Sequence, residues 1–424
     1  MAYSSRIVDG ELDVLLAGLP AISMEGPKAV GKTETALRRA GTVHRLDDPE
    51  QLQIAQAAPD RLVGGEPPVL IDEWQRLPTS WDLVRRAVDA GSGPASFLLT
   101  GSMAPREAPV HSGAGRIVTV RMRPMSLAER WPETPAVSLA RLLKGRARPP
   151  VEGATERTLA DYADEIVRSG FPAIRQLSGR LLRAQLDGYL DRIVERDFAE
   201  SGHRVRERGG LRRWLTAYAA ASSTTATFET IRDAASAGTG DRPAKTTTLP
   251  FRATLEHLWM IEEVPAWTPV RSRLRRLASS PVHQLADPAL AARLLGVDVD
   301  ALIEGASAGP AMPRDGTLLG ALFESLVTLS VRVYAQAAKA RVYHLRTRAG
   351  EREVDLIVER GDGRVLALEV KLAATVRDED LRHLHWLADR IGGELLDAVV
   401  ITTGREAYRR EDGIAVVPAA LLGP

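Results

Sequence analysis

The sequence of 424 residues contains no cysteine. Disulfides, thiolate zinc sites and cysteine nucleophiles are therefore excluded, and any metal ion must be held by oxygen or histidine ligands. No stretch approaches the ~20 consecutive apolar residues of a membrane-spanning helix, and the N-terminus lacks the basic start, apolar run and cleavage site of a secretion signal. We therefore expect a cytoplasmic protein without a membrane partner.

Net charge is almost absent as well, because 56 lysine and arginine residues are balanced by 55 aspartate and glutamate residues. A nucleic-acid partner would need a local basic patch rather than a globally basic surface. The apolar fraction of 44% and the charged fraction of 26% are typical of a globular protein. Because single domains usually contain about 100 to 200 residues, two or three domains are expected.

The first part of the chain, up to residue 135, alternates short apolar runs with helical patterns. This alternation is typical of βαβ units and predicts a parallel sheet. Leu182, Leu186 and Leu190 follow at four-residue spacing, which predicts a helical region. The later run TLEHLWMIEEVPAW indicates the last helix and first wing strand of a winged-helix unit.

The segment Gly26–Thr33 reads GPKAVGKT and fits the G-x-x-x-x-G-K-[ST] phosphate-binding loop between an apolar run and a helical pattern. Its glycines let backbone N–H groups face phosphates, and the following helix presents a positive N-terminus. Lys32 should contact the β- and γ-phosphates, and Thr33 should bind Mg²⁺. The alternative is an ordinary glycine-rich turn. The residues expected to line ATP are Gly26, Pro27, Lys28, Ala29, Val30, Gly31, Lys32, Thr33 and Glu34.

Three further segments supply candidates for ATP hydrolysis. Asp72 ends the apolar run PVLID, where it can hold a magnesium-bound water, and Glu73 can polarise the attacking water. An acid pair after a strand is also a common helix start. Thr100, at the end of FLLT, suits a γ-phosphate sensor or a plain turn. Arg116 is a candidate arginine finger, acting in a homo-oligomer if it reaches a neighbouring subunit, or else a solvated surface residue.

The motif order GPKAVGKT, VLIDEWQ, FLLTGS, GAGRIVTVRMRPMSLAE, RSGFPAI and YLDRIVERD is similar to that of bacterial and archaeal AAA+-like ATPases whose catalytic domain precedes a domain of uncharacterised function. The resemblance spans essentially the whole chain and implies a STAND- or AAA+-type ATPase core. One departure is Lys28-Ala29, where such families usually carry Arg-Gln before Val-Gly. The phosphate chemistry should survive it, because these positions contribute backbone groups.

A second set of charged residues lies near the C-terminus. Asp355, Glu369 and Lys371 have the spacing D-x13-E-x-K, which resembles the core of the PD-(D/E)XK nuclease-like fold. Glu369 and Lys371 share a face, because residues two apart on a strand point together. Asp355 and Glu369 could bind Mg²⁺ with Glu324 from a helix, and Lys371 could orient or deprotonate the attacking water. The alternative is a cross-strand salt bridge.

Other conspicuous residues have simpler interpretations. Two arginine-rich segments, 203–213 and 271–276, could bind nucleic-acid phosphates, or they are solvated faces. Trp259 and Trp267 are expected to be packing residues rather than base-stacking platforms. His383 and His385 would point away from one another on a helix and do not make a zinc pair.

The fold class expected from these patterns is α/β, with a P-loop NTPase parallel sheet, a helical and winged-helix middle region and a C-terminal α/β nuclease-like domain. The expected domains are an ATPase core over 1–150, a helical lid over 151–220, a winged-helix-like region and linker over 221–312, and the nuclease-like domain over 313–424. The last boundary follows a stretch rich in Ser, Ala, Gly and Pro.

The favoured interpretation is a Mg²⁺-dependent ATPase whose turnover rearranges a C-terminal nuclease-like domain that acts on DNA, with ATP and Mg²⁺ as cofactors. One alternative is a STAND-type regulatory switch whose C-terminal domain only binds a protein or nucleic acid. Another is an ATPase with a degenerate C-terminal domain. The presence of all four residues Glu324, Asp355, Glu369 and Lys371 favours the first interpretation. A domain that had evolved only to bind a partner would be free to lose any of these four residues.

Overall fold

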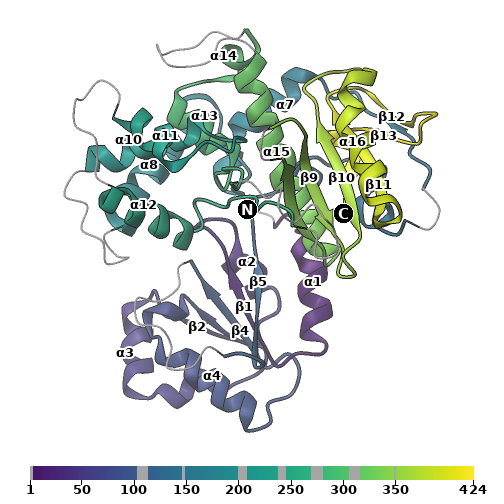
Figure 1. Cartoon of the computed structure of the whole chain (residues 1–424). Coiled ribbons are helices and arrows are strands. Elements are labelled where there is room, and N and C mark those ends of the chain that lie inside the picture. Colours follow the sequence, from purple (N-terminus) through teal and green to yellow (C-terminus); the bar gives the residue numbers. More distant parts are fainter. Residues whose placement is uncertain are drawn as a thin grey trace.

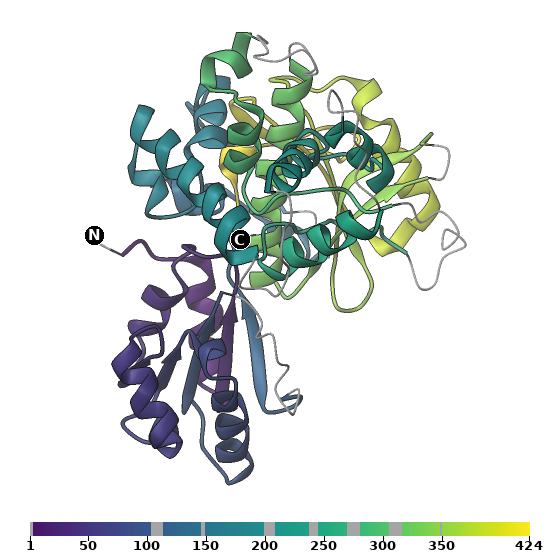
Figure 2. The same ribbon diagram turned by 90° about the vertical axis from the view of Figure 1, so that its left-hand side faces the viewer.

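The structure is a computed structural model. It describes residues 3–102, 113–145, 149–198, 208–236, 245–268, 280–304, 316–347 and 350–424. Figures 1 and 2 show two lobes, one built on the N-terminal sheet and one that combines the middle helices with the C-terminal sheet. The largest cluster of buried apolar side chains includes Leu98, Tyr162, Phe323 and Val399. A single hydrophobic core therefore joins the two lobes.

The N-terminal lobe is built on a parallel sheet. Among the described residues its strands are β1 (Ala21–Glu25), β2 (Thr42–Arg45), β3 (Val69–Asp72), β4 (Phe97–Gly101) and β5 (Ile117–Arg121). Their order is β2-β3-β4-β1-β5, and every neighbouring pair is parallel. β3 and β4 are buried along their whole length, as strands covered on both faces are. The predicted parallel sheet is confirmed.

Four helices accompany this sheet: α1 (Ile7–Leu16), α2 (Lys32–Leu37), α3 (Pro49–Ala57) and α4 (Thr79–Asp89). β4 lies between β1 and β3, so the carboxyl ends of these three strands meet at one edge. That edge is where ligands bind in open α/β sheets. The sheet order therefore brings the segments after β1, β3 and β4 to the same place.

The middle of the chain is helical, as predicted. Its described helices are α5 (Leu127–Arg130), α6 (Leu139–Leu142), α7 (Leu159–Arg168), α8 (Gly179–Arg192), α10 (Arg208–Ala220), α11 (Phe228–Ala235), α12 (Lys245–His257), α13 (Pro288–Leu295) and α14 (Val299–Glu304). The leucine stripe of α8 is buried. After α12, antiparallel bridges join Ile261 to Leu285 and Val264 to Val282. The winged-helix interpretation of this region stays a prediction.

The C-terminal part begins with α15 (Gly316–Ala337). It continues through β8 (Arg341–Arg346), β9 (Glu353–Glu359), β10 (Val365–Val370), α16 (Asp378–Ile391), β11 (Leu395–Thr402), β12 (Glu406–Arg409), β13 (Ala415–Pro418) and β14 (Leu422–Gly423). The elements from α15 to β11 were predicted, whereas β12 to β14 were not. In the described residues, the main sheet has the order β7-β12-β13-β11-β10-β9-β8, where β7 is Gly153–Ala154. α16 packs beside β9, β10 and β11.

Two short strands that follow the N-terminal sheet in sequence belong to the C-terminal part in space. β6 (Val137–Ser138) pairs with β14, and β7 (Gly153–Ala154) pairs with β12. The predicted domain boundaries stay predictions, and these pairings show that the segment around residue 150 is tied to C-terminal strands.

α15 is the one described helix that is long and apolar enough to cross a membrane by length and composition. Its span Leu318–Ala337 is nevertheless 72% buried inside the protein. Figure 1 places it between the middle helices and the C-terminal sheet. Its apolar character is therefore that of a core helix.

Candidate nucleotide site and carboxylate cluster

The predicted phosphate loop connects the end of β1 to the start of α2. A Cβ atom on Gly26, whose φ is +154°, would lie 2.0 Å from the carbonyl oxygen of Met122. Gly31 has a φ of +102°, in the left-handed region that favours glycine. Both glycines of the motif are thus required, Gly26 by close backbone approach and Gly31 by its conformation.

Lys32 lies folded over this loop. Its Nζ donates hydrogen bonds to the carbonyl oxygens of Gly26 (2.9 Å) and Pro27 (2.8 Å). Burial lowers the pKa of Lys32 to about 8, against the opposing charge of Glu73. The ammonium group is therefore held at the mouth of the loop by two weak, neutral acceptors.

Asp72 contacts two other residues that were predicted from separate segments, Thr33 and Thr100. The hydroxyl of Thr33 donates a hydrogen bond to Asp72 Oδ1 over 2.9 Å, and the hydroxyl of Thr100 donates to the same oxygen. The pairing of β3 with β4 sets Asp72 directly opposite Thr100. The sheet register therefore produces this arrangement.

Glu73 lies next to this group, and its carboxylate is bound on both oxygens. The hydroxyl of Ser102 donates to Glu73 Oε1 over 3.1 Å, and the amide of Gln75 donates to Oε2. Gln75 and Ser102 were not predicted as site residues. A signal for Ser102 existed, because it lies two residues after Thr100, the spacing at which side chains of an extended chain point to the same side.

A cavity of about 690 Å³ opens above the phosphate loop. Lys32, Thr33, Glu73 and Ser102 line it from the sheet edge. From the helical region it is lined by residues that follow the RSGF sequence between α7 and α8, namely Pro172, Ala173, Arg175 and Gln176. The cavity therefore lies between the phosphate loop and the region predicted to be a lid.

Two arginines of this wall, the buried Arg130 and the half-buried Arg175, were also not predicted. Arg175 donates to both carboxylate oxygens of Glu165, each over 2.8 Å. Arg130 donates to the backbone oxygen of Glu165 over 2.8 Å. Although burial raises the pKa of Glu165, the hydrogen bond from Arg175 and the charges of both arginines bring it below its ordinary value.

Arg116 lies away from this cavity. Its neighbour Ile117 pairs with Ala21 at the start of β1, whereas the phosphate loop follows Glu25 at the other end. The guanidinium donates to Asp89 Oδ1 over 2.8 Å at the end of α4. The structure therefore does not bring Arg116 to the phosphate loop of its own chain, and action from a neighbouring subunit stays a prediction.

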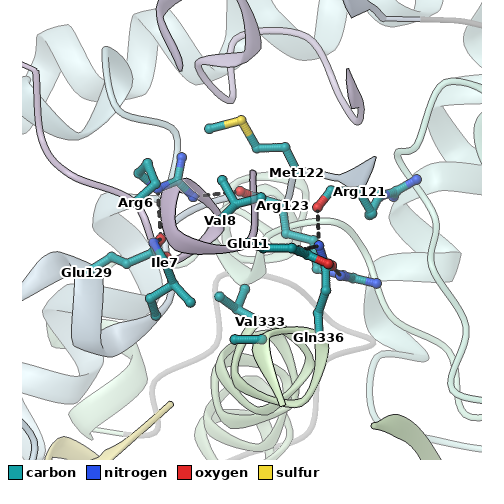
Figure 3. A pocket seen from close by; sticks show the side chains of 11 residues that line it. Arg6, Ile7, Val8, Glu11, Arg121, Met122, Arg123, Glu129, Val333 and Gln336 are labelled. Atoms are coloured by element: carbon teal, nitrogen blue, oxygen red, sulfur yellow. Dashed lines mark hydrogen bonds and ion pairs between the residues drawn. The ribbon is translucent and has the colours of Figure 1, made fainter. Parts of the chain in front are cut away.

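Arg6 connects the phosphate loop to the rest of the molecule (Figure 3). It donates to the carbonyl oxygen of Val30 over 2.9 Å, to Glu129 Oε1 over 2.9 Å and to the carbonyl oxygen of Arg123 over 2.8 Å. Its side chain is only 3% exposed. Arg6 was not predicted, because nothing in the local sequence indicates this long-range contact.

On the other side of Figure 3, Gln336 reaches from α15 toward the end of β5. Gln336 donates to Glu11 Oε2 over 2.7 Å and to the carbonyl oxygen of Arg121 over 2.9 Å, and it accepts from Arg123 over 2.6 Å. Burial raises the pKa of Glu262, but Arg123, Arg332 and Arg121 lower it far below its ordinary value. One charged junction thus joins β5, the segment after α12, and α15.

The C-terminal acids also come together as predicted. The amide of Val370 donates to Asp355 Oδ2 over 2.7 Å, and Lys371 Nζ donates to Glu369 Oε1 over 2.8 Å. Burial, strengthened by the charge of Asp355, raises the pKa of Glu369 to about 8. Burial raises the pKa of Asp355 to about 6. Burial and the charge of Asp355 raise the pKa of Glu324 well above its ordinary value.

That Glu324, Asp355 and Glu369 bind a divalent metal ion stays a prediction. Within the described ranges, no group of three or more histidine, aspartate or glutamate side chains is arranged to hold a metal ion. Asp355 is committed to the Val370 amide and Glu369 to Lys371. These bonds use one oxygen of each carboxylate, and Glu369 Oε2 is buried without a hydrogen-bond partner, so Glu369 retains an oxygen for a metal.

The remaining candidates are only partly described. The arginine-rich segments 203–207 and 271–276 lie outside the described residues. Trp267 is buried and donates to Glu359 Oε1 over 3.1 Å, as expected for a packing residue. The ring of Trp259 lies 3.4 Å from the guanidinium carbon of Arg121, so it contacts a cation of the charged junction.

Comparison with known protein families finds three matches along the chain. Residues 19–131 match the model of an AAA domain, residues 159–301 match a domain of unknown function (DUF8612), and residues 319–422 match another (DUF4143). Uncharacterised proteins of Mycobacterium bovis and Mycobacterium tuberculosis are each 26% identical over 99% of this chain and 84% of their own length.

A Walker-type ATPase of Pyrococcus abyssi is similar over 68% of this chain and 94% of its own, with a TM-score of 0.37 and 15% identity. Residues 19–131 match the AAA domain, and they carry the parallel sheet and phosphate loop of the P-loop ATPase fold.

Proposed function

We propose that this protein binds ATP with Mg²⁺ and hydrolyses it at the edge of the N-terminal sheet. The observation that carries the proposal is that Lys32, Thr33 and Glu73 line one cavity, although they come from two separate segments. Asp72 lies behind this wall and accepts a hydrogen bond from Thr33. Thr33 and Asp72 present a hydroxyl and a carboxylate oxygen 2.9 Å apart, and oxygen is the ligand that Mg²⁺ prefers. The residues present therefore fit the nucleotide and its metal.

Each residue has a separate role in this proposal. Lys32 exchanges its loop carbonyl partners for the β- and γ-phosphates, whose charge is a stronger acceptor. Thr33 and Asp72 hold Mg²⁺, which supplies charge neutralisation when bound there. Glu73 polarises the attacking water. Thr100, on β4, holds the Asp72 carboxylate in place through its hydrogen bond. Arg116 contributes only if a neighbouring subunit supplies it.

We further propose that ATP turnover changes the C-terminal part through α15. The amides of Leu127 and Ala128, at the start of α5, donate to Ser330 Oγ (3.1 Å) and to the hydroxyl of Tyr334 (3.0 Å). α5 also carries Glu129, which binds Arg6. The same helix α15 carries Glu324, about 9 Å along the axis from Ser330. A displacement of the phosphate loop would therefore be transmitted to the acid cluster by a rigid helix.

The proposed action of the C-terminal part is metal-dependent cleavage of nucleic acid, with DNA as the expected substrate. Support comes from the order α15, β8, β9, β10, α16, β11, with Asp355 on β9 and Glu369 at the end of β10. The alternative is a regulatory ATPase whose C-terminal part only binds a partner. The observation that favours this alternative is that the ammonium group of Lys371 already pairs with Glu369 Oε1 over 2.8 Å, as in an ordinary salt bridge.

The first test measures nucleotide binding and phosphate release by the wild-type protein with Mg²⁺. Lys32→Ala should abolish binding, whereas Glu73→Gln should bind ATP and fail to hydrolyse it, because only the base is removed. Lys144→Ala, at an exposed position, is the matched control for loss of a lysine. A Glu73→Gln variant with undiminished turnover would remove Glu73 from the mechanism.

The second test incubates the protein with labelled single- and double-stranded DNA and RNA, with Mg²⁺ or Mn²⁺, and with or without ATP. Cleavage that is lost in Asp355→Ala but retained in Lys144→Ala supports a nuclease. Binding without cleavage of any of the four substrates supports the regulatory alternative.

A further inference from the structure

The backbone of Glu73 adopts an unusual conformation for a residue with a side chain. Its φ of 55° and ψ of 44° lie in the left-handed region, which is unfavourable for residues other than glycine and asparagine. Such strain persists at sites where the surrounding structure determines the backbone. The conformation directs the Glu73 side chain into the cavity above the phosphate loop, whose wall it forms.

The turn after β3 packs closely against Gly101 at the end of β4. A Cβ atom on Gly101 would lie 2.8 Å from Gln75 Oε1 and 2.9 Å from Trp74 Nε1. Trp74 is buried and packs against Trp81 with ring centroids 4.6 Å apart. Glycine at position 101 therefore allows Gln75 to come close enough to reach the Glu73 carboxylate.

β4 and the residue that follows it supply one hydroxyl to each acid of the site. Thr100 donates to Asp72, and Ser102, two residues further, donates to Glu73 Oε1 over 3.1 Å. Gln75 donates to the second carboxylate oxygen of Glu73. Each carboxylate oxygen has two acceptor sites, so both oxygens retain capacity for the attacking water after these bonds are made.

We infer that Gln75 and Ser102 are positioning residues, which fix the direction of the Glu73 carboxylate toward the attacking water. The inference rests on the proposed ATP hydrolysis and deepens it. A base that is aligned in advance avoids the reorganisation that a mobile glutamate would need in each turnover. Neither residue contacts phosphate in this proposal, so their removal affects the chemical step and not nucleotide affinity.

The experiment compares steady-state ATP hydrolysis and the dissociation constant of a fluorescent ATP analogue in Ser102→Ala and Gln75→Met. The first removes the hydroxyl, and the second keeps the volume of the side chain and removes its donor. We expect kcat to fall on the order of 10- to 100-fold in each, since misplacing a catalytic group by about 1 Å costs up to about 100-fold. The dissociation constant should remain within about 2-fold.

Two further variants separate positioning from a general structural role. Ser102→Thr keeps the hydroxyl and should restore most of kcat, whereas Ser96→Ala, before the start of β4, should leave kcat unchanged. Unchanged or increased kcat in both Ser102→Ala and Gln75→Met would overturn the inference. So would a parallel loss of nucleotide affinity, which would indicate that the loop itself is damaged. Wild-type protein that binds the analogue without hydrolysing ATP would refute the proposed hydrolysis, and this inference with it.

Discussion

The backbone amide of Leu127 donates a hydrogen bond to the hydroxyl of Ser330, which lies 203 residues later in the chain. The start of a short helix has amide groups with no partner inside the helix. In α5 the amides of Leu127 and Ala128 are satisfied by side chains of α15, and the amide of Glu129 by the preceding Ser126. The orientation of α5, and with it of Glu129, therefore depends on α15.

This dependence predicts coupling between the phosphate loop and the acid cluster. Binding of a non-hydrolysable ATP analogue should change hydrogen exchange in residues 353–371, and the double variant Ser330→Ala, Tyr334→Phe should lose that change while still binding the analogue. Tyr408→Phe removes an exposed hydroxyl from the same C-terminal sheet and should preserve the response. Wild-type protein that binds the analogue without any change at 353–371 would exclude this coupling.

The position of Arg116 predicts that any catalytic effect of this residue requires a second subunit. Arg116→Ala should lower turnover by roughly 1,000-fold, the lower end of the effect of arginine fingers, with little change in ATP affinity. Specific activity of the wild type should then rise steeply with protein concentration. Arg85→Ala, which breaks another ion pair to Asp89, is the matched control. Specific activity that does not depend on concentration would indicate a monomeric mechanism.

The acid cluster predicts a pH dependence of stability. The pKa of Glu369 is raised in the folded protein from 4.5 to about 8. Between these values the folded protein holds a proton that the unfolded chain has released, so the free energy of unfolding should decrease as pH rises. The slope for one such group is about 1.4 kcal/mol per pH unit.

Chemical denaturation between pH 5 and pH 8 provides the measurement for this prediction. Glu369→Gln, which cannot ionise, should flatten the decrease, whereas Glu406→Gln on exposed β12 should not. A decrease of the same size in wild type and Glu369→Gln would mean that another group is responsible.

The same cluster predicts a response to divalent metal in the full-length protein without nucleotide. Mn²⁺ should neutralise the repulsion between Asp355 and Glu369 and raise the melting temperature, with about 2.7 kcal/mol of stabilisation at 100 times the dissociation constant. The double variant Asp355→Ala, Glu369→Ala should lose the increase and keep ATP hydrolysis. To exclude the site at Thr33 and Asp72, the comparison is repeated in Asp72→Ala. No metal-dependent shift at millimolar Mn²⁺ would favour the regulatory alternative.

The sequence predicted the phosphate loop and the meeting of Thr33, Asp72 and Thr100, because these depend on a local motif and on strand ends of one parallel sheet. The sequence also contained a signal that Arg116 lies away from the phosphate loop of its own chain. This arginine precedes β5, so it belongs to the amino edge of the sheet, opposite the phosphate loop.

Other site residues had no comparable signal. The contact of Gln75 with Glu73 depends on a left-handed backbone that the sequence does not reveal. Arg6 reaches Val30 and Glu129 across 24 and 123 residues, and such contacts leave no local periodicity. The roles of Arg130 and Arg175 depend on how the helical region folds over the sheet, which hydrophobic patterning does not fix.

The pairing of β7 with β12 has a consequence for the order in which the protein folds during synthesis. Residues 153 and 154 leave the ribosome long before Glu406 and Ala407, with which they pair. Until then β7 lacks its partner, and non-local pairings of this kind form slowly. A chain arrested in this interval would expose strand edges that promote aggregation. Chaperone dependence should therefore be highest for nascent chains that end between α15 and β12.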